Sequence, residues 1–201
     1  MIIGLTGTYC AGKNHIAALF ETRGIPVLDV DKLGYKALET EKETILARFG
    51  SDLQKNDGTL DRRLLGQRVF LDPIKLAALE AIVHPVANRL TDEWVSAQRG
   101  HCVINAALLH RSSIFDRLER IILVKAPFFT RFLRARQRDN LPWKEIFKRF
   151  ASQKDFNSRY LSINAKAISA EIYIVENPGL SKTGNHLKLE RRIDKIIEGI
   201  V

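Results

Sequence analysis

Short apolar runs alternate along the chain with longer stretches in which apolar residues recur at helical spacing. The runs are too short for typical helices, and strands that alternate with helices pair in parallel through right-handed crossovers. The predicted strands are Met1–Leu5, Ile25–Leu28, Cys102–Ile104, Ile121–Val124 and Ile172–Val175. We therefore predict an α/β fold of three layers, with a parallel sheet of about five strands between helices.

Two stretches depart from this alternation because they contain only helical patterns. The first spans about 33–99, and the second spans about 128–158 and is broken at Asp139–Pro142, a typical helix stop and restart. We expect residues 1–201 to form a single domain, in which the first stretch is a helical substrate-binding insertion and the second a helical lid. Helices predicted in the insertion are Thr40–Phe49, Arg62–Phe70, Pro73–Val83 and Val86–Gln98.

Composition narrows the classes of partner. The net charge of +9 favours an anionic partner, such as a phosphorylated metabolite, a nucleic acid or an acidic membrane. Nucleic acid is disfavoured because aromatic residues do not interleave with the basic ones, and no apolar run approaches the roughly 20 residues of a membrane helix. Cys10 and Cys102 form neither a disulfide framework nor a metal-ligand spacing. We expect a cytoplasmic protein that binds neither nucleic acid nor membrane, as a monomer or weak homo-oligomer.

The segment from Gly7 to Asn14 reads GTYCAGKN and matches the Walker A pattern in both glycines and the lysine. Such a loop curls round a phosphate, directs backbone N–H groups at it, and is followed by a helix N-terminus. A chance turn is the alternative, but a strand precedes the segment and an amphipathic helix follows, which favours a P-loop NTPase fold. The predicted ATP-binding residues are Thr8, Tyr9, Cys10, Ala11, Gly12, Lys13, Asn14 and His15.

The pattern usually ends in Ser or Thr, whose hydroxyl holds Mg²⁺. In this chain it ends in Asn14, whose amide oxygen can coordinate the cation, hold a water that does, or cap the helix. Asp29 and Asp31 follow the second predicted strand, and in an extended segment both would point to one side. One would accept a proton while the other holds Mg²⁺; the alternatives are a solvated loop or a helix cap.

At this point the chain resembles the dephospho-CoA kinase family over nearly its whole length. The ordered series of matches is more specific than any single one. The matching residues are Gly4-Leu5-Thr6-Gly7, the phosphate loop, Asp29-Val30-Asp31, Phe49-Gly50, Asp57-Gly58, Leu60-Asp61-Arg62, Leu65, Val69-Phe70, Leu79-Glu80, Ile82, His84-Pro85, Leu108-Leu109, Arg134, Gln137-Arg138-Asp139, Gln153, Asn177 and Gly179.

The resemblance implies that ATP phosphorylates the 3′-hydroxyl of dephospho-CoA to give coenzyme A, with ATP and Mg²⁺ as the donor complex. It implies catalytic roles for Asp31 as base, Lys13 as phosphate clamp and Arg138 as lid arginine. The other implied residues are Asn177 and Gly179 near adenine and Asp31, Arg62, His84 and Leu108 at the acceptor. The candidate metal ligands, from their side-chain chemistry, are Asn14 and Asp29.

Each of these roles has a plainer reading, and some positions depart from the family. Arg62 can be a surface ion-pair residue, His84 a helix cap, and the segment from Asn177 to Gly179 a turn. Asn105 and Arg111 stand where the family has carboxylates, and Glu171 stands where it has Asp. Two other functions therefore stay open: another P-loop small-molecule kinase, such as one acting on a nucleoside monophosphate, or a nucleotide-binding homologue with little or no turnover.

Overall fold

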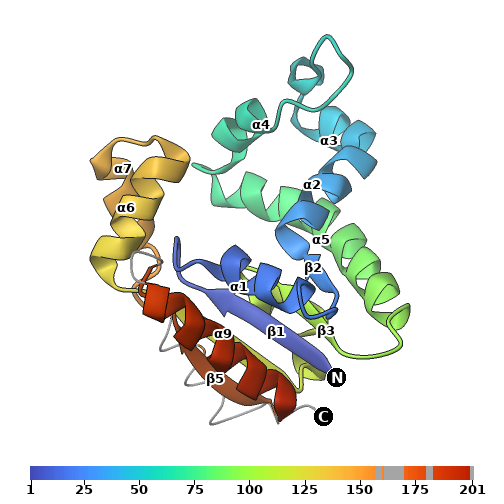
Figure 1. The fold of residues 1–201 in the computed structure, drawn as a ribbon. Coiled ribbons are helices and arrows are strands. Elements are labelled where there is room, and N and C mark those ends of the chain that lie inside the picture. Colours follow the sequence, from blue (N-terminus) through green and yellow to red (C-terminus); the bar gives the residue numbers. More distant parts are fainter. Residues whose placement is uncertain (157–159, 161–169, 180–182, 200–201) are drawn as a thin grey trace. The chain divides into compact units, whose positions relative to one another are not determined.

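The computed structural model describes residues 1–156, 160, 170–179 and 183–199. The chain divides into two compact units, one of residues 1–28 and 98–201 and the other of residues 29–97 (Figure 1). The first unit contains the sheet and is called the sheet unit below. The second is mainly helical and is called the helical unit.

Five strands form one sheet in the order β2-β3-β1-β4-β5. The pairs β1–β3, β1–β4 and β4–β5 are parallel, so the predicted parallel sheet is confirmed. At its centre β1 is almost entirely buried, as an apolar run flanked by two strands requires. The strands are β1 (Ile2–Gly7), β2 (Val27–Asp29), β3 (Cys102–Asn105), β4 (Arg120–Lys125) and β5 (Glu171–Glu176).

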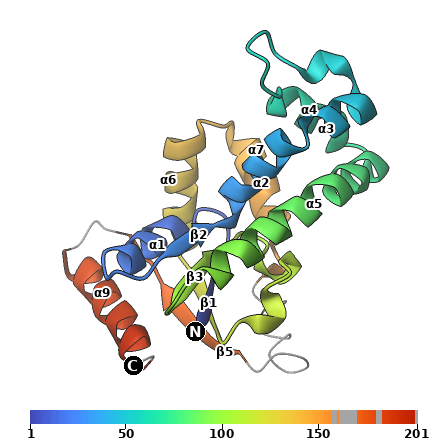
Figure 2. The ribbon, with the colours of Figure 1, turned by 90° about the vertical axis from the view of Figure 1, so that its right-hand side faces the viewer.

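One face of the sheet is covered by α1 (Lys13–Glu21) and α9 (Thr183–Glu198), which lie side by side (Figures 1 and 2). Leu189, Ile193 and Ile196 of α9 are buried in the core, whereas Lys188 and Arg192 are exposed. Lys188 and Arg192 therefore lie on a solvated helix face. Two short 3₁₀ helices, η2 (Leu109–Arg111) and η3 (Phe115–Arg117), contact each other. Leu109 of η2 lies against Gly4 of β1, on the face opposite Ile3 and Leu5.

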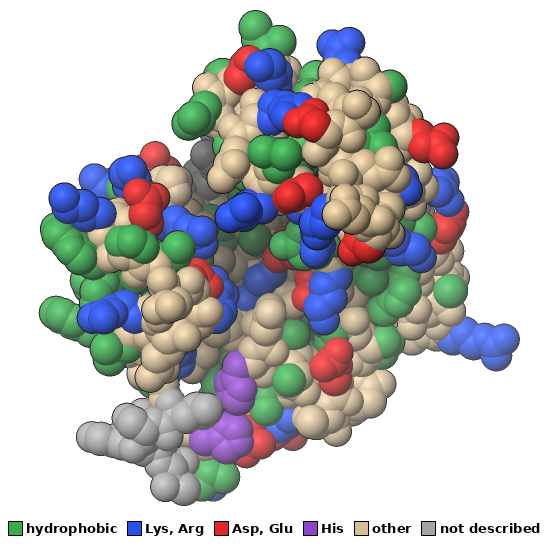
Figure 3. Space-filling view, turned by 90° about the horizontal axis from the view of Figure 1, so that it is seen from above, with side chains coloured by type: hydrophobic (Ala, Val, Ile, Leu, Met, Phe, Trp, Pro, Cys, Tyr) green, Lys and Arg blue, Asp and Glu red, His purple; other side chains and the backbone are tan. Residues whose placement is uncertain are grey.

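The predicted lid is a pair of helices, α6 (Phe128–Asp139) and α7 (Trp143–Ala151), and the predicted break between them is confirmed. Asn140 ends α6 in the left-handed conformation, and Pro142 precedes α7. Hydrophobic and basic side chains share the surface of this pair, on the left of Figure 3. Its exposed apolar side chains are Phe128, Phe129, Leu133, Trp143 and Phe147.

The helical unit packs its helices around a separate core that includes Ile45, Leu53 and Leu65. Its elements are α2 (Val30–Thr40), α3 (Lys42–Phe49), η1 (Ser51–Leu53), α4 (Arg62–Val69) and α5 (Pro73–Ser96). The prediction of two helices on either side of Pro85 is wrong, because α5 runs through that proline. Ile82 and Val83 pack against the core just before Pro85, and this burial outweighs the lost backbone hydrogen bond.

The structure also corrects the expectation for the aspartate pair. Asp29 ends β2 and caps α2 by accepting a hydrogen bond of 3.3 Å from the N–H of Lys32. Asp31 lies in the first turn of α2, so the two residues are not part of an extended segment. Among the described residues, no helix has the length and apolar character needed to cross a membrane.

Candidate functional site

The phosphate-loop sequence forms a tight turn between β1 and α1. The N–H of Ala11 donates to the carbonyl of Thr8 at 2.9 Å, which closes the turn. Cys10 and Gly12 both have positive φ, 59° and 94°, so the chain curls in a way that extended or helical backbone cannot. Lys13 begins α1, and the positive end of a helix dipole favours an anion. The loop therefore has the shape and polarity of a phosphate site.

Asn177 fixes the inner side of this loop. Its side chain is 2% exposed, donates to the carbonyl of Ala11 at 3.0 Å and accepts from Arg134 at 3.1 Å. Arg134 in turn donates to the carbonyl of Ala11 at 3.0 Å. A Cβ on Gly12 would lie 2.1 Å from the amide nitrogen of Asn177, so this close approach requires glycine. Gly179, at φ 115°, lies close to Arg134 on the same side.

Tyr9 connects the loop to the lid through both its backbone and its side chain. Its N–H donates to the side chain of Gln153 at 2.6 Å, and its carbonyl accepts from Arg131 at 2.9 Å. Its hydroxyl donates to the carboxylate of Asp139 at the end of α6. The ring packs edge-on against Phe150 of α7, with centroids 5.7 Å apart. Both lid helices thus contact one residue of the loop.

Asp139 binds two arginines of the lid, Arg138 and Arg149. It accepts hydrogen bonds from Arg138 at 2.6 and 3.1 Å and from Arg149 at 3.2 Å. The Arg138 hydrogen bond lowers the pKa of Asp139, and the same bond raises the pKa of Arg138. Burial, reinforced by the bond to Asp139, raises the pKa of the Tyr9 hydroxyl. Tyr9, Arg138 and Asp139 therefore keep their ordinary charge states at neutral pH.

Asn14 faces Asn105, the last residue of β3, and the two amides share a hydrogen bond of 3.2 Å. Asn105 is 2% exposed, and its side-chain oxygen is buried without a hydrogen-bond partner in the described structure. A buried carbonyl oxygen without a donor is an acceptor that a cation or water would satisfy. Oxygen atoms are also the ligands that Mg²⁺ prefers. These residues fit a magnesium ion, although the described residues contain no cluster of three His, Cys, Asp or Glu suited to a metal.

His15 lies in the first turn of α1 opposite His186 of α9, with ring centroids 5.7 Å apart. The Nε2 of His15 and the Nδ1 of His186 are buried and have no hydrogen-bond partner in the described structure. Burial, followed by the nearby His186 and Arg134, lowers the pKa of His15. His15 is therefore held neutral next to the phosphate loop at physiological pH.

The predicted site residues fall into two groups. Most of those in the sheet unit lie together, and the remaining ones belong to the helical unit. The residues from Thr8 to His15, with Asn177 and Gly179, form one site, and Arg138 contacts it through the ring of Tyr9 at 5.2 Å. Leu108 follows β3 and is 48% exposed. Asp29, Asp31, Arg62 and His84 belong to the helical unit. His84 lies inside α5, so its alternative reading as a helix cap is wrong.

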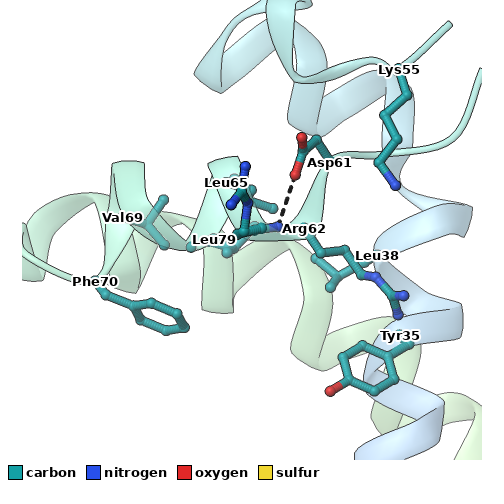
Figure 4. A pocket seen from close by; sticks show the side chains of 11 residues that line it. Tyr35, Leu38, Lys55, Asp61, Arg62, Leu65, Val69, Phe70 and Leu79 are labelled. Atoms are coloured by element: carbon teal, nitrogen blue, oxygen red, sulfur yellow. Dashed lines mark hydrogen bonds between the residues drawn. The ribbon is translucent and has the colours of Figure 1, made fainter. Parts of the chain in front are cut away.

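The helical unit contains a pocket of about 580 Å³ lined by residues of α2, α4 and α5 (Figure 4). The guanidinium of Arg62 lies over the ring of Tyr35, 4.4 Å from its centroid. Asp61 caps α4 by accepting from the N–H groups of Arg63 and Leu64. The pocket combines apolar walls with cationic groups. Its lining residues are Tyr35, Leu38, Lys55, Asp61, Arg62, Arg63, Leu65, Gly66, Val69, Phe70 and Leu79.

Several residues of the site were not predicted to belong to it. Asn105 was noted in the sequence as a departure from a family pattern. Its contact with Asn14 could not be predicted, because the two residues are 91 positions apart in the chain. Arg149 had no sequence signal, because α7 carries other basic residues on its exposed face. Asp139 appeared in a helix stop and in the family series, without a role in the site, yet it binds two arginines and Tyr9.

Comparison with known proteins identifies the family. The sequence profile of dephospho-CoA kinase matches residues 1–176. A dephospho-CoA kinase of Shouchella clausii is 34% identical over 184 residues, which cover 88% of this chain and 90% of that protein. The crystal structure of TT1252 from Thermus thermophilus superposes with a TM-score of 0.81 at 32% identity and covers 100% of this chain and 98% of that one.

The dephospho-CoA kinase from Campylobacter jejuni, at 22% identity and a TM-score of 0.69, covers 100% of this chain and 98% of its own and shares the fold. The predicted P-loop architecture is thereby confirmed. Since the family profile matches most of its length, the chain belongs to the dephospho-CoA kinase family of ATP-dependent kinases.

Proposed function

We propose that this protein transfers the γ-phosphoryl group of ATP to the 3′-hydroxyl of dephospho-CoA, giving ADP and coenzyme A. The observation that carries the proposal is the curled phosphate loop, followed by the N-terminus of α1, in a chain of this family. Such a loop binds the phosphates of a nucleotide. The family supplies the identity of the acceptor.

On the donor side, the residues from Thr8 to His15 bind the phosphates of ATP, and Lys13 supplies a charge at their bridging oxygens. Asn177 and Gly179 are assigned to the adenine side, next to the carbonyl of Ala11. Arg138 stabilises charge on the group in transfer, since arginine matches the geometry of phosphoryl oxygens. This role is supported by its contact with the ring of Tyr9, a residue of the loop.

The metal proposed here is Mg²⁺, bound with ATP. Asn14 and Asn105 would hold it through their side-chain oxygens, and Asp29 is a further proposed ligand, although its carboxylate also caps α2. When bound, the ion neutralises charge on the phosphates during transfer. The amides themselves orient the end of the loop, because their mutual hydrogen bond ties α1 to β3.

On the acceptor side, Asp31 accepts the proton of the attacking hydroxyl, while the oxygen of that hydroxyl bonds to phosphorus and ADP leaves. The pocket of the helical unit is proposed to bind the rest of the acceptor. Its apolar residues suit an aliphatic arm, and Lys55, Arg62 and Arg63 suit a diphosphate. His84 and Leu108 are proposed to contribute to the acceptor site.

The test measures ADP release on adding dephospho-CoA to enzyme, ATP and Mg²⁺, with mass spectrometry of the product. We expect a product heavier by one phosphoryl group and no comparable ADP release with nucleoside monophosphates. Asp31→Asn should lower kcat far more than ATP affinity, whereas Asp116→Asn, an exposed carboxylate of η3, should leave both unchanged. ADP release with a nucleoside monophosphate instead would establish the rival kinase, and ATP binding without any transfer would establish a non-catalytic homologue.

We further propose a cytoplasmic enzyme, since Cys10 and Cys102 are free thiols. A monomer or weak homo-oligomer is proposed for its state in solution. Sedimentation velocity at several protein concentrations tests the second proposal, and a tight oligomer at all concentrations would contradict it.

A further inference from the structure

We infer that Tyr9 and Asp139 are positioning residues, which hold Arg138 and Arg149 of the lid against the phosphate loop so that these arginines act on the group in transfer. The inference rests on the proposed function, because it names further residues for the same reaction. All the residues involved belong to the sheet unit, and the central group is the carboxylate of Asp139.

Asp139 accepts from three partners that come from three different segments. Arg138 approaches both carboxylate oxygens, at 2.6 and 3.1 Å, and Arg149 approaches one of them at 3.2 Å. The Tyr9 hydroxyl donates to the same oxygen as Arg149. The carboxylate side chain is 17% exposed, whereas the Arg138 and Arg149 side chains are 60% and 52% exposed. A half-buried anion therefore fixes two cations that are otherwise free to sample solvent.

Tyr9 joins this cluster to the loop. The guanidinium carbons of Arg138 and Arg149 lie 5.2 and 5.4 Å from its ring centroid, within the range of cation–π attraction. Its backbone is held by Gln153 and Arg131, so the ring cannot move without the loop. The pair Tyr9–Asp139 thus sets the distance between the lid arginines and the residues that bind phosphate.

The positions of these arginines matter because their side chains are long and lose considerable conformational entropy when they are fixed. Arginines already held in place stabilise charge in the transition state without further ordering. The negative charge of Asp139 weakens the binding of ATP itself, because it offsets part of the attraction between the arginines and the phosphates. Loss of the carboxylate should therefore lower turnover without weakening ATP binding.

The experiment compares Asp139→Asn, Tyr9→Phe and the double variant with wild type, using kcat with dephospho-CoA and the ATP dissociation constant from calorimetry. Asp139→Asn should lower kcat about tenfold or more and leave ATP affinity unchanged or tighter. Tyr9→Phe keeps the ring and should lower kcat less. The double variant should have the same kcat as Asp139→Asn, since both changes break the same hydrogen bond between Tyr9 and Asp139.

Asp194→Asn is the matched control, because it breaks the Arg23–Asp194 pair of 2.5 Å in the same unit. It should lower the melting temperature and leave kcat unchanged, which separates positioning from a general loss of stability. Asp139→Glu should recover part of the lost turnover. Unchanged kcat in Asp139→Asn, weaker ATP binding in place of slower turnover, or additive losses in the double variant would overturn the inference.

A second measurement needs no acceptor and so separates this inference from the proposed function. The chain has two tryptophans, and Trp94→Phe leaves Trp143, the first residue of α7, as a reporter of the lid. In that background Asp139→Asn should lower the fluorescence anisotropy of Trp143 without ATP. If wild type does not phosphorylate dephospho-CoA, the proposed function fails while a lower anisotropy still supports the positioning; an unchanged anisotropy would refute it.

Discussion

Replacement of Gly12 by alanine tests whether the phosphate loop depends on the close approach of Asn177. Gly12 has φ 94°, a conformation that disfavours any residue with a Cβ. The added carbon would lie 2.1 Å from Asn177 Nδ2 and 3.2 Å from a guanidinium nitrogen of Arg134. The first distance is too short for any contact, so Asn177 or the loop must move.

Two contributions to the free energy of unfolding can be separated. Left-handed backbone costs alanine about 1–2 kcal/mol relative to glycine. Displacing the buried amide of Asn177 from the carbonyl of Ala11 and from Arg134, now 3.0 and 3.1 Å away, costs about 1–3 kcal/mol more. Gly24 isolates the first contribution, because it has φ 75° and a Cβ there would meet nothing within 4 Å.

The assay is thermal and urea unfolding of Gly12→Ala and Gly24→Ala beside wild type, with ATP calorimetry. Gly12→Ala should be about 1–3 kcal/mol less stable than Gly24→Ala, or about 2–4 °C lower in melting temperature for each kcal/mol. ATP affinity should fall at least about tenfold in Gly12→Ala only, because the loop amides shift away from the phosphates. Equal stability of the two variants, or normal ATP binding by Gly12→Ala, would refute this reasoning.

Three further predictions concern single side chains. Lys13→Ala should lower kcat by about 10²–10³-fold, as loss of a charge-stabilising group does, while the melting temperature changes little; ADP release and thermal unfolding check both. The free energy of unfolding should fall as the pH drops below about 6.5, because the pKa of His15 is lowered in the folded state and the unfolded state binds more protons there. His15→Gln should reduce that slope in urea unfolding between pH 7 and pH 5.5. Arg62→Ala should raise KM for dephospho-CoA about tenfold and leave KM for ATP unchanged, with Arg89→Ala, from an exposed ion pair, as the control in the same steady-state assay.

The sheet and the loop were predictable because their signals are local. Each strand is a short apolar run, and burial on both faces of a parallel sheet requires such runs. Gly12 and Lys13 follow from the demands of phosphate binding on backbone and charge. The break of the lid at Asn140 follows from its left-handed conformation and the proline two residues later.

What the sequence did not predict depends on contacts between distant residues. Pro85 indicates a helix boundary, but packing of Ile82 and Val83 against the helical core keeps α5 continuous. The distance between Asp29 and Asp31 in the sequence indicates nothing about the helix that starts between them. Tyr9 is an ordinary variable position of the motif, and its bond to Asp139 spans 130 residues.

The charges around the loop explain why neutral amides at Asn14 and Asn105 are compatible with nucleotide binding. Lys13 and four lid arginines lie on or near the loop, and in the described network Asp139 is the carboxylate that offsets them. Such a surplus of positive charge attracts a triphosphate and repels a free divalent cation. For the proposed Mg²⁺, the negative charge would then come mainly from the phosphates themselves, with the proposed side-chain ligands completing the coordination. Metal and nucleotide are therefore expected to bind this protein as one complex, which is compatible with the uncharged side chains of Asn14 and Asn105.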